Sequence, residues 1–258
     1  MIITDIEQLR SKLDAKDPIE GATFTDIDWS DLDCDSARFT GCVIDGAQFS
    51  NVVFVGATFS RCQFLRCRFA RSELCDAEFE ECAFTTRDDK PVGCSFAFSD
   101  LRRTRFLKSD LSLCQIERSD LFSVEMDHCN LRGTRFHKVD FSHAYSRKVV
   151  VTRATFRSCN LEFADLAEAR LAECDFTDSR LREADLTSAD LTDAVLRGCD
   201  LFRAELAGAK LEGADLRGAE ISGLNLLSLG SFARMKIDQS QQHALLLGIG
   251  LDVYPESP

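Results

Sequence analysis

The sequence contains very little proline, tryptophan and tyrosine, and it has no long apolar run. Only four prolines, one tryptophan and two tyrosines occur among the 258 residues. No apolar run reaches the ~18 residues that a membrane-spanning helix requires. The segment from Met1 to Glu7 carries acids where a signal peptide has basic residues and an apolar core. We therefore expect a cytoplasmic protein that does not act at a membrane.

Basic residues are outnumbered as well. The chain has 31 Lys and Arg against 43 Asp and Glu, a formal net charge of −12. Proteins that bind nucleic acid need a basic face for the phosphates, so no direct nucleic-acid binding is expected. An acidic chain of this kind suits contact with the basic surface of a protein partner.

Phenylalanine and cysteine are abundant, with 20 and 12 residues, and both follow a repeat of five. Large apolar residues recur at every fifth position from Phe24 to Phe84 and again from Phe96 to Leu226, giving about forty repeats. A small residue, usually Ala, Cys, Ser or Thr, stands two positions before each large one. A period of five does not match the 3.6-residue turn of a helix.

Two apolar positions two residues apart lie on one face of an extended segment. The other residues of each repeat turn a corner, and one such unit cannot bury its apolar face alone. The units must therefore coil and stack. The small residue leaves room for the large one, as a narrow interior requires.

These motifs resemble the pentapeptide repeat family, with the consensus A-[D/N]-L-x-x, from roughly Ala22 to Ser228. The resemblance implies an all-β fold, a right-handed quadrilateral β-helix with four repeats per coil and about ten coils. We expect an N-terminal capping helix in residues 1–18, the solenoid in residues 19–228, and a C-terminal helix and dimerisation segment in residues 229–258.

Most cysteines occupy the small inward positions, where cysteine packs as a small apolar residue. They are Cys42, Cys62, Cys67, Cys82, Cys94, Cys114, Cys129, Cys159, Cys174 and Cys199. No CxxC or Cys/His spacing of a metal site appears, so neither a metal nor a cofactor is expected. No histidine pairs with a nucleophile, and a filled interior leaves no pocket. We therefore expect no catalytic residues and no enzymatic activity.

Two segments interrupt the repeat. Arg87–Gly93 shifts the frame by two residues and contains the only proline inside the solenoid, so a loop is predicted there. Ala144–Arg153 keeps the frame but places Ser146 at a large apolar position. We interpret it as a second protruding loop. The alternative is a strained but continuous coil, in which these residues form two whole repeats and their deletion would shift the later repeats to other walls. The candidate partner-binding residues are Arg87, Asp88, Asp89, Lys90, Pro91, Tyr145, Arg147, Lys148 and Arg153.

The two ends carry helix signals. Thr4 and Glu7 form a capping-box pattern at the start of the N-terminal helix. A second helix is predicted from Asp238 to Leu247. The C-terminal segment is more apolar than a lone cap requires, which predicts a homodimer formed there. The candidate dimerisation residues are Leu229, Phe232, Met235, Leu245, Leu246, Leu247 and Ile249.

The residue between the two inward positions points outward and is often acidic. With twenty residues in every coil, one wall would carry an acidic series and the next wall would extend it. The predicted acidic face is Asp100, Asp120, Asp140, Asp200 and Glu220 on the first wall, with Asp165, Asp185 and Glu205 on the second.

From Glu81 to Leu161 the chain is similar to the Qnr-type (Qnr/MfpA) quinolone-resistance proteins. The shared features are a break after Phe84, a charged loop followed by G-C-x-F, and a second loop before Phe156. The C-terminal run from Leu247 to Val253 resembles their L-G-I-x-V ending, and the N-terminal helix and early repeats depart from them. The resemblance implies a homodimer that binds DNA gyrase or topoisomerase IV and protects it from quinolones, with acidic mimicry of DNA as one model. The alternative is a protein-interaction scaffold or effector with an unrelated partner.

Overall fold

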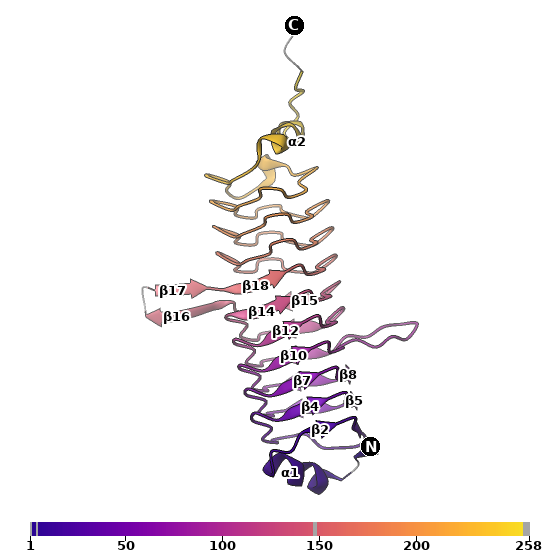
Figure 1. The fold of residues 1–258 in the computed structure, drawn as a ribbon. Coiled ribbons are helices and arrows are strands. Elements are labelled where there is room, and N and C mark those ends of the chain that lie inside the picture. Colours follow the sequence, from indigo (N-terminus) through magenta and orange to yellow (C-terminus); the bar gives the residue numbers. More distant parts are fainter. Residues whose placement is uncertain (1, 4, 147–148, 255–258) are drawn as a thin grey trace.

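The computed structural model describes residues 2–3, 5–146 and 149–254, which form a rod of stacked coils (Figure 1). Short parallel strands from successive coils pair with one another, so the rod is an all-β solenoid, as the repeat predicts. Among the described residues, no helix is long and apolar enough to span a bilayer.

The helices are α1 (Ile6–Asp14), η1 (Leu226–Ser228), η2 (Gln239–Gln241) and α2 (Gln242–Gly248). The strands before the first insertion are β1 (Ile2–Ile3), β2 (Ile19–Glu20), β3 (Thr23–Phe24), β4 (Arg38–Thr40), β5 (Val43–Asp45), β6 (Gln48–Ser50), β7 (Thr58–Ser60), β8 (Gln63–Leu65), β9 (Arg68–Ala70) and β10 (Glu78–Glu80). The strands after it are β11 (Ser95–Ala97), β12 (Arg105–Leu107), β13 (Gln115–Glu117), β14 (Val124–Asp127), β15 (Arg135–His137), β16 (Ser142–Ser146), β17 (Val149–Thr152) and β18 (Ala154–Arg157).

Hydrogen-bonded ladders divide the rod into four walls, numbered here in the order in which the chain visits them. Wall 1 holds β2, β4, β7, β10, β12, β14 and β18 and continues through Asp175, Val195 and Asp215 to Lys236. Wall 2 holds β1, β3, β5 and β8 and continues through Ala83, Asp110, Asn130, Asn160, Arg180 and Asp200 to Glu220. Wall 3 holds β6, β9, β11, β13 and β15 and continues through Asp165 and Asp185 to Glu205. Wall 4 is a series of bridged residues, from Asp33 to Asp140 and from Arg170 to Ser231.

The large apolar residues fill the interior, where rings from successive coils stack. Phe59, for example, lies parallel to Phe39 and Phe79, with ring centroids 4.9 and 4.7 Å away. All twelve cysteines are buried free thiols. Burial raises the pKa of Cys174 and Cys199 to about 12, which keeps both thiols protonated and unreactive.

Both ends of the solenoid are covered. Helix α1 is capped by Asp5, whose side chain accepts a hydrogen bond from the Glu7 N–H at 3.0 Å. The predicted cap, Thr4, lies outside the described residues. At the other end, Gln241 Nε2 donates to the carbonyls of Leu216 and Ala219 at 2.8 and 2.7 Å. The second bond satisfies a carbonyl that an open last coil would leave unpaired, whereas the Leu216 carbonyl also accepts the Ala219 N–H at 3.0 Å.

Overpacking the interior should destabilise the rod. Ala184 is fully buried, so we expect Ala184→Leu to lower the free energy of unfolding by about 1–3 kcal/mol. Ala207 lies exposed at a corner, and Ala207→Leu should change stability by less than about 0.5 kcal/mol. Denaturant unfolding measures both, and equal effects would contradict the predicted inward packing.

Asp215 on wall 1 should make the rod sensitive to acid. Its buried carboxylate accepts hydrogen bonds from the Arg217 Nε at 2.8 Å and the Arg197 Nε at 2.7 Å, and these arginines hold its pKa well below the usual range. A lowered folded-state pKa stabilises the protein above the unfolded pKa of about 3.9, and this contribution is lost as the pH falls below that value.

Asp215→Asn should therefore cost about 1–3 kcal/mol at neutral pH. The difference from wild type should shrink towards zero as the pH falls below about 4. Urea unfolding at several pH values measures this difference. A constant difference across the pH range would show that Asp215 is not the acid-sensitive group.

Candidate partner-binding surfaces

The first insertion, Arg87–Gly93, leaves the rod at the edge between walls 2 and 3. An antiparallel bridge between Thr85 and Gly93 closes its base, and the loop extends away from the coils beside β10 (Figure 1). From Ala83 on wall 2 to Ser95 on wall 3 the chain takes twelve residues in place of five. The seven extra residues form the loop, so the coils above and below it keep their pairing.

The base of this loop requires a glycine. A Cβ on Gly93 would lie 2.4 Å from backbone atoms of both Leu113 and Cys114 in the next coil. On the lower side, Asp88 lies 3.7 Å from the Arg66 guanidinium. A hollow of about 430 Å³ separates the loop from wall 2; its lining includes Arg61, Gln63, Arg66, Ala83, Thr86, Arg87 and Asp88. The loop is thus anchored above and below, over a polar recess.

The second insertion is an antiparallel hairpin of β16 and β17, which stands out from the rod at the edge between walls 4 and 1 (Figure 1). This geometry supports the protruding loop over the strained coil. At the base, Arg153 donates its N–H to the carbonyl of Phe141 at 2.9 Å, which places it near the solenoid. Arg147 and Lys148 lie outside the described residues.

An aromatic cluster holds the hairpin against the rod. The Phe122 ring lies 5.2 Å from the His143 ring and 6.4 Å from the Tyr145 ring, measured between centroids. Tyr145 remains two-thirds exposed, and Val149 and Val150 are also exposed. The sequence pattern points to Tyr145 but not to Phe122 or the valines, because an outward Phe in one repeat does not show which later segment will cover it.

The hairpin changes which wall each later repeat occupies. The prediction that the acidic residues form one continuous face is therefore wrong. From Asp140 on wall 4 to Thr155 on wall 1 the chain takes fifteen residues in place of five. The ten extra residues leave the coil and turn the later repeats by half a coil. Asp100, Asp120 and Asp140 lie on wall 4, whereas Asp200 and Glu220 lie on the opposite wall 2, and Asp165, Asp185 and Glu205 lie on wall 3.

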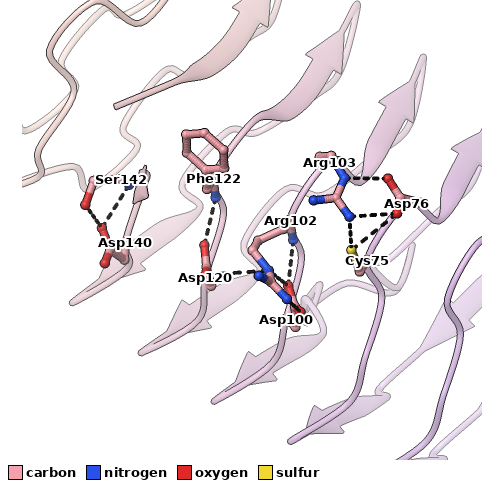
Figure 2. A network of polar contacts seen from close by, with 9 residues as sticks. All are labelled: Cys75, Asp76, Asp100, Arg102, Arg103, Asp120, Phe122, Asp140 and Ser142. Atoms are coloured by element: carbon pink, nitrogen blue, oxygen red, sulfur yellow. Dashed lines mark hydrogen bonds and ion pairs between the residues drawn. The ribbon is translucent and has the colours of Figure 1, made fainter. Parts of the chain in front are cut away.

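The acidic residues therefore form two groups. The upper group occupies the adjoining walls 2 and 3. The lower group is the wall 4 column, in which Asp100, Asp120 and Asp140 bridge to one another on successive coils and lead to the base of the hairpin (Figure 2). Asp140 accepts hydrogen bonds from the backbone and hydroxyl of Ser142, the first residue of β16.

Burial raises the pKa of Asp120, and the neighbouring carboxylates of Asp100 and Asp140 add to this effect. Arg102 offsets part of this repulsion, because its Nε donates to Asp100 at 2.8 Å and lies 3.7 Å from Asp120 (Figure 2). The column is thus partly neutralised by its own neighbours. Among the described residues, no group of acidic, Cys or His side chains is arranged to hold a metal ion.

The C-terminal end carries exposed apolar side chains, but only some are the predicted ones. Phe232 and Leu247 are 42% and 48% exposed. Leu245 is buried, and Leu229 and Met235 pack against the core, so these three stabilise the cap instead of facing a partner. Leu246 and Ile249 are half-buried. Four further apolar side chains are exposed at this end but were not predicted, because they follow no repeat: Leu227, Leu251, Val253 and Tyr254.

Comparison with known proteins agrees with this architecture. A model of pentapeptide repeats matches residues 20–54 and, in overlapping segments, residues 159–227. The chain contains pentapeptide repeats.

The pentapeptide repeat protein QnrB4 of Escherichia coli is 24% identical to it over 87 residues, or 34% of this chain. That match spans 40% of the length of QnrB4. Two solved structures of QnrB1, described as a plasmid-mediated fluoroquinolone resistance protein, share its fold at 22% identity. A trypsin-treated variant covers 83% of this chain and 99% of its own chain with a TM-score of 0.73; the full-length form covers 86% and 96% with a TM-score of 0.67.

Proposed function

We propose that this protein binds DNA gyrase or topoisomerase IV without catalysing a reaction and protects the enzyme from quinolones. The observation that carries the proposal is the pair of insertions that leave the solenoid while strand pairing continues past them, except on wall 4 beside the hairpin. Regular coils would stack without them, and ordering a protruding segment costs conformational entropy. The fold shared with QnrB1, described as a fluoroquinolone resistance protein, supports the drug class. The partner class is what the resemblance of residues 81–161 to the Qnr-type proteins implies.

The two insertions lie on diagonally opposite edges, because one separates walls 2 and 3 and the other walls 4 and 1. A partner that contacts both must reach around the rod. We propose that the acidic groups on walls 2, 3 and 4 occupy a basic groove of the topoisomerase, where DNA normally binds, while the insertions fix the position. Duplex DNA carries one negative charge per ~1.7 Å, whereas one column of the rod carries at most one acidic residue per ~4.8 Å coil. The rod therefore matches the sign of the DNA charge but not its density.

A supercoiling assay tests the proposal. We expect the protein to restore gyrase supercoiling in the presence of ciprofloxacin and to co-purify with gyrase or topoisomerase IV. Heat-denatured protein at the same concentration serves as a negative control for effects of added protein. Absence of both binding and protection by the folded wild type would leave the alternative, an interaction scaffold with an unrelated partner.

A further inference from the structure

The edge between walls 2 and 3 carries a second unusual feature, above the first insertion. Backbone hydrogen bonds join its corner residues coil by coil: the N–H of Leu113 donates to the carbonyl of Arg132, and the N–H of Phe163 donates to that of Arg182. The side chains that face outward along this line, here called the arginine–aromatic edge, include Leu113, Arg132, Phe163, Arg182, Phe202 and Arg203, together with the acidic Glu162 and Glu183.

Arginines on this edge lie over aromatic rings. The guanidinium carbon of Arg132 is 4.6 Å from the centroid of Phe163, and those of Arg182 and Arg203 are 5.0 and 5.1 Å from the centroid of Phe202. Three of the four such contacts in the described part of the chain occur on this one edge. Their concentration here indicates a surface feature that the repeat itself does not require.

One ring and one leucine of this edge remain available to a partner, while the Phe202 ring is half-buried. Phe163 is 45% exposed and Leu113 is 39% exposed. The coil between them has Gly133 at this corner, and its missing side chain makes room for Leu113, whose Cδ2 lies 3.0 Å from the place a Cβ would take. Leu113 thus extends over the Gly133 corner, while Arg132 of the same coil covers the Phe163 ring of the next one.

The arginines also keep unused hydrogen-bonding capacity. Arg132 and Arg182 approach carboxylates only at 3.7 and 3.5 Å, and neither makes a side-chain hydrogen bond to another described residue. Arg103 and Arg157, on other edges, donate directly to aspartates at 2.7 Å. Stacked arginines and aromatic rings are the side chains that most often dominate binding energy at protein interfaces.

The distance between successive side chains along the edge favours a helical partner over an extended one. Apolar and arginine side chains alternate on successive coils, with about 4.8 Å per step and about 19 Å in total. A helix advances about 5.4 Å per turn and stays in step with the coils over this length. Side chains on one face of a strand recur at about 6.7 Å, so an extended partner would fall out of register with the 4.8 Å steps after about one coil.

The charges on and beside the edge indicate which side chains the partner helix should carry. Along the edge, carboxylates of the partner would meet Arg132 and Arg182. Beside the edge, wall 2 presents Asp200 and wall 3 presents Asp165 and Asp185, which favour cations on the partner's flanks. We propose that this edge binds a protein helix with an apolar and acidic seam and basic flanks. The proposal does not depend on the topoisomerase function.

The probe is a synthetic helical peptide with leucine at every seventh position, glutamate four residues after each leucine, and lysines on both flanks. A peptide of the same composition, with glutamates and lysines exchanged, is the control. We expect the first peptide to bind the full chain, by fluorescence anisotropy at concentrations up to about 1 mM, and the exchanged peptide to bind at least about tenfold more weakly.

Two variants locate the site. Phe163→Ser and Arg132→Gln should each weaken peptide binding at least about fivefold. Phe98→Ser is the matched control, because the 53% exposed Phe98 ring also lies under an arginine, Arg118, but on the edge between walls 3 and 4. It should bind the peptide as wild type does. Circular dichroism verifies that each variant is folded.

Three results would overturn the proposal. They are equal binding of both peptides or no binding of either, an equal loss for Phe98→Ser and Phe163→Ser, and a change of oligomeric state in Phe163→Ser. The last would show that the edge contacts a second copy of the chain. The assay contains no topoisomerase, so a failure here is separate from a failure in the supercoiling assay.

Discussion

Deleting residues 87–93 or residues 144–153 is expected to leave the solenoid intact and to abolish most of the protection of gyrase. Each deletion removes only the residues that the insertion adds to the five-residue step. Thr86 then joins Cys94, or His143 joins Ala154, with the period of five restored. The core should therefore lose no inward side chain, and the melting temperature should stay close to that of wild type.

The expected loss of protection is at least about tenfold in the protein concentration needed, because segments held on a rigid scaffold usually carry the specific contacts. The assay is supercoiling in the presence of ciprofloxacin. A loop of equal length made of Gly and Ser, in place of residues 87–93, separates loss of side chains from loss of length. Substituting Arg147 and Lys148 by Ala does the same for the hairpin. If the folded variants all protect as wild type does, the insertions are not the contact sites.

Removing residues 235–258 is expected to produce aggregates or a destabilised monomer. The truncation takes away Gln241, so the carbonyl of Ala219 loses its partner at the end of the rod, and the carbonyl of Leu216 keeps only the Ala219 N–H. An uncovered edge of this kind can pair with other chains. It also removes Leu247 from the exposed apolar end, where we propose that two copies meet about a two-fold axis.

A second variant separates dimerisation from capping. Phe232→Glu with Leu247→Glu changes exposed side chains and keeps Gln241, so the rod should stay folded but become monomeric. Light scattering gives the mass of each form. A monomeric wild-type protein would refute the C-terminal dimer, whereas a dimeric double variant would move the interface elsewhere on the molecule.

The five-residue repeat determined the coil, the inward positions and the two interruptions without any structure. The alternation of a small and a large apolar residue leaves the chain one way to bury both, so the core from Phe24 to Leu224 follows directly from the pattern. Local signals also sufficed for the C-terminal helix, since Asp238 and Gln241 cap each other within a few residues.

The tertiary structure alone decided which repeats share a wall. Ten residues can form half a coil or a hairpin, and the frame of five is the same in both cases, so Asp140 and Asn160 look like neighbours in the sequence. Once the hairpin leaves the rod, Asp140 faces Asp120 on wall 4, and Asn160 pairs with Asn130 on wall 2. The same shift separates the acidic groups and places Phe163 above Leu113. The five-residue period determines whether a side chain points inward or outward from its own coil. Which side chains of neighbouring coils it contacts depends on the path of the inserted residues, and only the tertiary structure shows that path.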